Sequence, residues 1–201
     1  MDYRTEFLKA LDFSEKMKFG MPDWCRSRPP FKTGSCLSMN TRKALKDLFN
    51  ILMRESGAAL FVGQCLNVSL IVSARVEQML EINPAITLGW IQDGGKTLFK
   101  FTPDDLDKWT RDGIDNPLKL NLHAWLTLPG LEIVDFSLPL SINHVDPSHP
   151  ASPVIDFWNE AKYQYHPVAV CCDSDLSRRF GFQGIRVIHL PLPCLQVDIY
   201  L

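Results

Sequence analysis

The segment that most constrains this chain is a long apolar run, CLNVSLIVSARVEQMLEI, at residues 65–82. Its valines and isoleucines would suit a strand. However, it holds no glycine or proline before Asn83-Pro84, and its length favours a helix. Residues 41–56 carry apolar side chains at helical spacing between Thr41, a residue suited to an N-cap, and Gly57. The sequence therefore predicts two helices in succession.

Downstream of Pro84 the pattern changes to short strands joined by turns. Asp93-Gly94-Gly95 separates AITLGWIQ from KTLFKF, and Pro129-Gly130 separates LKLNLHAWLTL from LEIVDFSLPL, which predicts two hairpins. Thr102-Pro103 begins a short helix between them. After a Pro/His loop, NHVDPSHPASP, we expect Ser152-Pro153 to cap a helix, VIDFWNEAKYQ, with short strands near VAVCC, IRVIHL and CLQVDIY.

Helices followed by an antiparallel sheet of consecutive hairpins indicate an α+β fold, with the N-terminal helices packed on the sheet. Neither GxGxxG nor GxxxxGKS/T occurs, so dinucleotide and Walker-type phosphate binding have no support. A chain of 201 residues fits one compact domain with appendages. We expect an N-terminal arm at residues 1–40, rich in proline and glycine after a short helical pattern, and a single domain at residues 41–201.

Composition argues against several classes of function. Lys+Arg 21 against Asp+Glu 23 gives a net charge of −2, which leaves no basic excess for nucleic acid or an anionic membrane. The chain lacks an apolar stretch of membrane-spanning length and a signal-peptide pattern, so a cytoplasmic location is expected. Six cysteines form no CxxC pair, which argues against structural zinc and a disulfide framework. We expect neither a metal nor a cofactor, and the sequence leaves the oligomeric state open.

The tripeptide Gly63-Gln64-Cys65 lies where a loop enters the long apolar helix. A thiol at a helix N-terminus faces unpaired backbone N–H groups and the positive end of the helix dipole, and both favour the thiolate. The same N–H groups could donate to an oxyanion on an attacked carbonyl, and Gln64 could add a side-chain donor. Cys65 is therefore the candidate nucleophile among the cysteines.

A thiolate that attacks a carbonyl also needs a proton donor for the leaving group, and the second hairpin offers one in His123. A loop at 128–130 with Gly130 in the left-handed conformation would place His123 directly opposite Asp135. Leu128 precedes proline and resists the helical conformation that such a loop prefers. A register shifted by one residue is therefore the alternative, and it would move Asp135 to the opposite face.

Together these residues resemble the transglutaminase-like (papain-like) cysteine fold. The resemblance rests on Gly63-Gln64-Cys65 at the start of an apolar helix, His123-Ala124-Trp125 on a strand and Asp135 on the next strand, and it covers about residues 58–140. Members of this superfamily include bacterial cysteine proteinases, leader-peptide proteases, arylamine N-acetyltransferases and protein-glutamine deamidases.

The resemblance implies a catalytic triad, with Cys65 as the nucleophile, His123 as general base and acid, and Asp135 as the carboxylate that orients the histidine. It implies acyl transfer from a peptide or glutamine amide of a protein or peptide substrate through a thioester. Protease, deamidase, transglutaminase and acetyltransferase activities share this chemistry, so the substrate and the second step stay open. Residues 1–57 and 141–201 match no pattern.

Other interpretations of the same residues remain. The main alternative is a catalytically silent protein-binding module, in which the triad-like residues pack in the core and the terminal extensions dock a partner. A metal hydrolase that uses His144, Asp146 and His149 is a weaker one. Trp125 could contact the substrate or only pack in the core. Adjacent cysteines at Cys171-Cys172 are expected to face the core and the surface.

Overall fold

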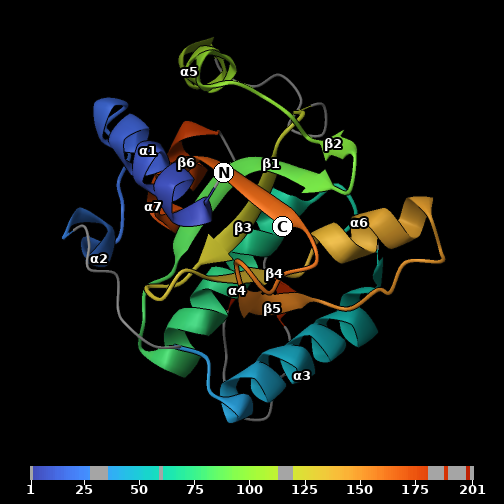
Figure 1. Cartoon of the computed structure of the whole chain (residues 1–201). Coiled ribbons are helices and arrows are strands. Elements are labelled where there is room, and N and C mark those ends of the chain that lie inside the picture. Colours follow the sequence, from blue (N-terminus) through green and yellow to red (C-terminus); the bar gives the residue numbers. More distant parts are fainter. Residues whose placement is uncertain are drawn as a thin grey trace.

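A computed structural model of the chain describes residues 2–27, 36–58, 61–112 and 120–180, together with two short paired strands, β7 (Ile188–His189) and β8 (Asp198–Ile199). The helices of the main body are α1 (Tyr3–Lys16), α2 (Asp23–Arg26), α3 (Met39–Ser56), α4 (Cys65–Leu80), α5 (Pro103–Asp112), α6 (Leu138–Val145) and α7 (Asp173–Arg179) (Figure 1). Its strands are β1 (Ala85–Asp93), β2 (Lys96–Leu98), β3 (His123–Thr127), β4 (Glu132–Asp135), β5 (Val154–Phe157) and β6 (Gln164–Cys171).

The strands form one curled antiparallel sheet in the order β2-β1-β3-β4-β5, with β6 paired to β1. Every strand pairing in it is antiparallel, and this confirms the predicted α+β class. The first predicted hairpin is also confirmed, because Asp93 pairs with Lys96 across a Gly94-Gly95 turn. In the middle of β1, a side chain on Gly89 would collide with the His166 carbonyl oxygen and the Trp125 ring. The close approach of β6 and Trp125 to β1 therefore requires glycine at this position.

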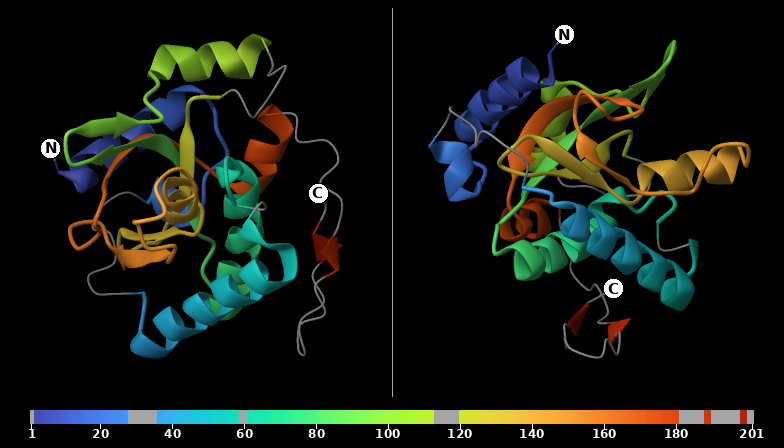
Figure 2. Two further views of the ribbon diagram at one scale, coloured as in Figure 1. Left: turned by 90° about the vertical axis from the view of Figure 1, so that its right-hand side faces the viewer. Right: turned by 60° about the horizontal axis from the view of Figure 1, so that its bottom comes forward.

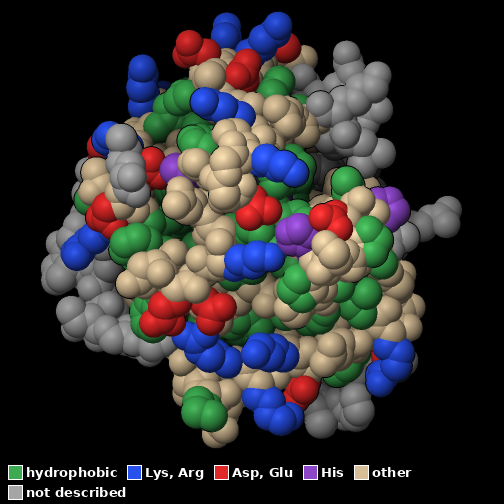
Figure 3. Space-filling view, turned by 45° about the vertical axis from the view of Figure 1, so that its right-hand side comes forward, with side chains coloured by type: hydrophobic (Ala, Val, Ile, Leu, Met, Phe, Trp, Pro, Cys, Tyr) green, Lys and Arg blue, Asp and Glu red, His purple; other side chains and the backbone are tan. Residues whose placement is uncertain are grey.

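Helices cover both faces of the sheet, as the sequence predicted for its N-terminal helices. On one face α3 and α4 share a core with alternate residues of β1 and β3, such as Leu88 and Leu126. On the other face α1 packs along β6 and buries Phe7 and Leu11. In two views α5 and α3 lie at opposite ends of the molecule (Figure 2). On the face drawn in Figure 3, basic and acidic side chains lie interspersed among hydrophobic ones. The predicted boundary at residue 40 stays a prediction, although α1, N-terminal to it, is part of a core.

The helix boundaries agree with the sequence except at their caps. Helix α4 begins at Cys65 and ends in Glu81, which takes the left-handed conformation just before Asn83-Pro84. Helix α3 begins before the predicted Thr41. Its N-cap is Ser38, whose side-chain oxygen accepts a hydrogen bond from the Thr41 N–H at 3.1 Å.

Two predictions in the C-terminal half are wrong. The expected helix after Ser152-Pro153 begins instead as the strand β5, because the buried Val154 and Ile155 pair with the edge of β4 that faces away from β3. Part of the expected Pro/His loop is the helix α6, whose first turn contains Pro139 where proline is tolerated. The VAVCC strand is confirmed within β6, whereas IRVIHL and CLQVDIY lie almost wholly outside the described residues.

Candidate active site

Cys65 is the first residue of α4, as predicted, and its side chain is half-buried at the edge of a pocket of about 120 Å³. Gly63 allows the loop to reach this point, because it adopts a φ of +69°, which favours glycine. The Cys65 thiol donates a hydrogen bond to the Leu122 carbonyl oxygen at 3.7 Å. The remaining lining comes from the following residues: Gly63, Gln64, Leu66, Asn67, Phe99, Leu120, Leu122, His123 and Ser141.

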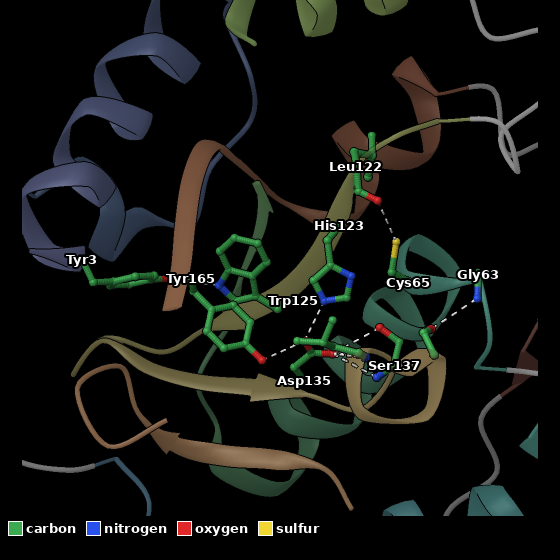
Figure 4. A network of polar contacts seen from close by, with 11 residues as sticks. Tyr3, Gly63, Cys65, Leu122, His123, Trp125, Asp135, Ser137 and Tyr165 are labelled. Atoms are coloured by element: carbon green, nitrogen blue, oxygen red, sulfur yellow. Dashed lines mark hydrogen bonds and ion pairs between the residues drawn. The ribbon is translucent and has the colours of Figure 1, made fainter. Parts of the chain in front are cut away.

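His123 lines the same pocket from the start of β3, with 2% of its surface exposed. Its Nε2 lies 2.6 Å from Oδ2 of Asp135, and its other ring nitrogen faces the side of Cys65 (Figure 4). The structure therefore brings together the three residues that the sequence singled out. The thiol, the imidazole and the carboxylate lie in a row that runs from the pocket into the core.

Asp135 is buried and receives hydrogen bonds on both carboxylate oxygens. Its Oδ1 accepts from the N–H groups of Ser137 and Leu138 at 2.9 and 3.1 Å, at the start of α6, and from the Ser137 hydroxyl at 3.2 Å. Its Oδ2 accepts from the Tyr165 hydroxyl at 3.0 Å in addition to facing His123. These bonds fix the carboxylate, so its position fixes the plane of the imidazole.

Burial and pairing act in opposite directions on the protonation of this pair. Burial alone would lower the pKa of His123, but the Asp135 carboxylate and a hydrogen bond with Cys65 outweigh it and raise the pKa to about 10. Burial would raise the pKa of Asp135, but the charge of His123 and the amides of Leu138 and Ser137 hold it below its usual value. The pair therefore favours an imidazolium and a carboxylate.

The hairpin register differs from the predicted one. Thr127 pairs with Ile133, not with Leu131, so His123 and Asp135 are diagonal neighbours and not directly opposite. The loop is 129–131, and Leu131, not Gly130, takes the positive φ of +65°. Proline favours the second position of such a turn, which leaves Leu128 paired with Glu132. Relative to the prediction the strands slip by two residues, and a slip of two keeps each side chain on its face.

The two other sequence candidates differ in their positions. Gln64 lines the pocket, where its Oε1 accepts a hydrogen bond from Asn67 Nδ2 at 2.7 Å. The amide nitrogen of Gln64 is thereby left available for a substrate oxygen. Trp125 is fully buried in the core beside His123, and its Nε1 donates to the Tyr3 hydroxyl at 3.0 Å. That position fits the packing interpretation of Trp125.

Sequence reasoning missed several residues that hold the site. Tyr165 comes from β6, 30 residues after the carboxylate it contacts, and no local pattern links the two. Ser137 could have been noticed, since Asp135-x-Ser137 before a helix is a turn-forming pattern. Phe99 stacks against His123 with ring centroids 5.4 Å apart, and nothing in the sequence points to it.

The remaining candidates lie away from the pocket. His149 contacts Asp146 at 3.2 Å, while His144 belongs to α6, and the described residues hold no cluster of three or more groups that could ligate a metal. Cys171 is buried and Cys172 half-buried, which agrees with the expected alternation. Within the described part of the chain, no helix has the length and apolarity needed to span a bilayer.

Comparison of the chain with protein-family models, curated proteins and solved structures finds no match. The function of the chain is therefore inferred from the chemistry of the site. The arrangement joins four chemical capacities: a thiol open to a pocket, a histidine that can exchange a proton with it, a buried carboxylate that orients the histidine, and backbone N–H groups at the start of α4.

Proposed function

We propose that this chain is a cysteine-dependent acyl-transfer enzyme with a transglutaminase-like (papain-like) core, acting on an amide of a protein or peptide through a thioester. One observation carries the proposal: a half-buried thiol lies beside a histidine that is held by a buried carboxylate, at the edge of a pocket. Each group alone is common in protein cores. Their spatial order, with the thiol at the pocket, the histidine next and the carboxylate in the core, is what a thiol nucleophile requires.

In the first step Cys65 acts as a thiolate whose proton His123 already holds as an imidazolium, and the sulfur attacks the carbonyl carbon of the bound amide. Asp135 stabilises this imidazolium and keeps the ring in plane. Negative charge develops on the substrate oxygen, where the backbone N–H groups of the first turn of α4 and the amide of Gln64 can donate.

In the second step the C–N bond of the tetrahedral intermediate breaks. His123 donates its proton to the departing nitrogen, which leaves as ammonia or an amine, and the acyl group stays on the Cys65 sulfur as a thioester. His123 then takes a proton from the incoming water or amine, which attacks the thioester and releases the Cys65 thiolate beside the protonated His123. Water yields a carboxylic acid and an amine yields a new amide, so the acceptor decides the reaction type.

The position of α4 supports the transglutaminase-like core. The helix that carries Cys65 packs on β3, whose first residue is His123, and β3 pairs with β4, whose last residue is Asp135. We include the expected cytoplasmic location in this proposal, because the free cysteines among the described residues are typical of a reducing compartment. In the alternative, a silent binding module, the same residues would serve packing only, and Cys65 would show no special reactivity.

Selective alkylation tests the proposal. Brief treatment of the native protein with iodoacetamide at pH 6.5, followed by peptide mapping, should label Cys65 first. Cys172 is the matched control, because it is also half-buried and immediately precedes a helix, but its thiol contacts the Ser174 hydroxyl and, in the described part of the chain, no histidine. His123→Ala should reduce labelling of Cys65 to the rate of Cys172. Equal labelling of both cysteines in the wild type would contradict the proposal and favour the binding module.

A further inference from the structure

Phe99 holds a backbone conformation that its residue type disfavours. It follows β2 with a φ of +59°, in the left-handed region. Among the described residues, the other non-glycine residues with positive φ are Lys18, Glu81 and Leu131, which follow a helix or turn a hairpin, where that conformation closes the element. A bulky aromatic residue in this region is strained, and such strain persists where the surroundings enforce it. At Phe99 the surroundings are the pocket of Cys65.

The conformation places the Phe99 ring beside His123. The two rings have centroids 5.4 Å apart and an interplanar angle of 26°. Trp125 stacks on His123 as well, at 5.9 Å and 23°. Along β1, Thr87 pairs with Trp125, Gly89 with His123 and Ile91 with Leu98. The imidazole therefore lies between the two aromatic side chains along the sheet.

We propose that Phe99 is a positioning residue of the acyl-transfer reaction, which together with Trp125 flanks His123 and stabilises its imidazolium form facing Cys65. Both ring centroids lie within about 6 Å of the imidazole, the range in which an aromatic face attracts a cation. This inference rests on the proposed function and adds a residue that acts on the protonated state of the histidine.

The other groups around His123 meet the edge of its ring. Cys65 approaches from α4 and Asp135 from β4, and Tyr165 of β6 donates to the same carboxylate oxygen. These contacts use the two ring nitrogens. The ring faces remain, and there Phe99 and Trp125 can add stabilisation without competing for a hydrogen bond. Phe99 also forms a wall of the pocket, so one side chain excludes water from the ion pair and limits the space beside the thiol.

The test compares Phe99→Leu and Phe99→Tyr with the wild type. Leucine keeps an apolar side chain of similar bulk but no aromatic face, whereas tyrosine keeps the face. The matched control is Phe101→Leu, since Phe101 is also aromatic and is more buried than the partly buried Phe99, but contacts Trp109 instead of His123. Two quantities are measured: the titration of the His123 ring by NMR, and the rate of Cys65 alkylation by iodoacetamide between pH 5 and 9.

We expect Phe99→Leu to shift the His123 titration to lower pH and to slow Cys65 alkylation at pH 6.5 by about three- to tenfold. Phe99→Tyr and Phe101→Leu should leave both readouts close to wild type. Phe99→Asn provides a second variant that tolerates the positive φ, so it should fold readily and yet lose reactivity. A wild-type titration and rate in both Phe99→Leu and Phe99→Asn would overturn the inference. Equal labelling of Cys65 and Cys172 in the wild type would instead overturn the proposed function.

Discussion

Replacing Asp135 by asparagine removes one charge from the core and almost no volume. Five groups form hydrogen bonds with the Asp135 carboxylate: the Ser137 N–H, the Ser137 hydroxyl, the Leu138 N–H, the Tyr165 hydroxyl and His123 Nε2. Every partner acts as a donor when His123 carries its proton. An asparagine amide has one acceptor and one donor end, so its NH₂ group must face donors on one side or the other.

The loss of folding stability in Asp135→Asn follows from this mismatch. Removing one member of a buried ion pair costs about 3–5 kcal/mol, because the partner charge is left without compensation. The matched control, Tyr165→Phe, removes one hydrogen bond from the same carboxylate oxygen and keeps the charge, so it should cost about 1 kcal/mol. Asp135→Asn should also slow Cys65 alkylation at pH 6.5 about tenfold or more, since a neutral amide does not stabilise the imidazolium. Tyr165→Phe should alkylate at close to the wild-type rate.

The direction in which stability changes with pH tests the charges of His123 and Asp135 independently. The pKa of Asp135 is lowered in the folded state, so its contribution is complete above its unfolded value and is lost as pH falls below about 4. The pKa of His123 is raised to about 10, so its contribution is complete below about 6.5 and is lost as pH rises toward 10. The wild type should therefore lose stability between these two values. In Asp135→Asn the buried imidazole prefers its neutral form, so the fall in stability between about pH 6.5 and 10 should disappear.

Urea unfolding at pH 5, 6.5, 8 and 9, with alkylation rates at the same values, measures all three effects. A charged His123–Asp135 pair is excluded if Asp135→Asn costs no more stability than Tyr165→Phe and keeps the wild-type slope of stability against pH. That result would mean that His123 and Asp135 are a neutral hydrogen-bonded pair.

Three further substitutions test the fold that positions the site. Gly89→Ala should destabilise the protein by about 3 kcal/mol or more, because its Cβ would lie 2.2 Å from the His166 carbonyl oxygen. A thermal midpoint within two or three degrees of wild type would contradict this close approach of β6 to β1. Ser38→Ala removes the side chain that caps α3 and should cost about 1 kcal/mol in urea unfolding, and no loss would place the cap elsewhere. Glu81→Gly should stabilise by about 0.5–1 kcal/mol, since an exposed residue with φ of +53° ends α4; a lower thermal midpoint would count against that conformation.

The sequence predicts the parts of the fold that local patterns determine. The apolar run at residues 65–82 forms α4 within two residues of its expected end, and the Asp93-Gly94-Gly95 turn forms the first hairpin. These elements succeed because periodicity and turn residues act over short distances. The β5 segment fails for the opposite reason. Val154 and Ile155 follow a helix-capping pattern, but the edge of β4 offers them a burial that no local signal shows.

The candidate site was predictable in its three principal residues and not in its surroundings. Cys65, His123 and Asp135 follow from their residue types and from strand alternation, which survived an error of two residues in the register. Tyr165 and Phe99 reach the site through tertiary packing of β6 and of the segment after β2. Their roles depend on distances between segments, and a single sequence does not encode those distances in a readable pattern.

A thioester on Cys65 is the intermediate that the proposed function requires, and it can be trapped and detected. The native protein is exposed briefly to p-nitrophenyl acetate at pH 6.5, and peptides are mapped by mass spectrometry with and without hydroxylamine, which removes acyl groups from thiols. If Cys65 is the nucleophile, it should carry one acetyl group that hydroxylamine releases; acetylation should be slower in His123→Ala and absent at this position in Cys65→Ala. Acetylation confined to lysines or to Cys172, with Cys65 unmodified, would contradict that role.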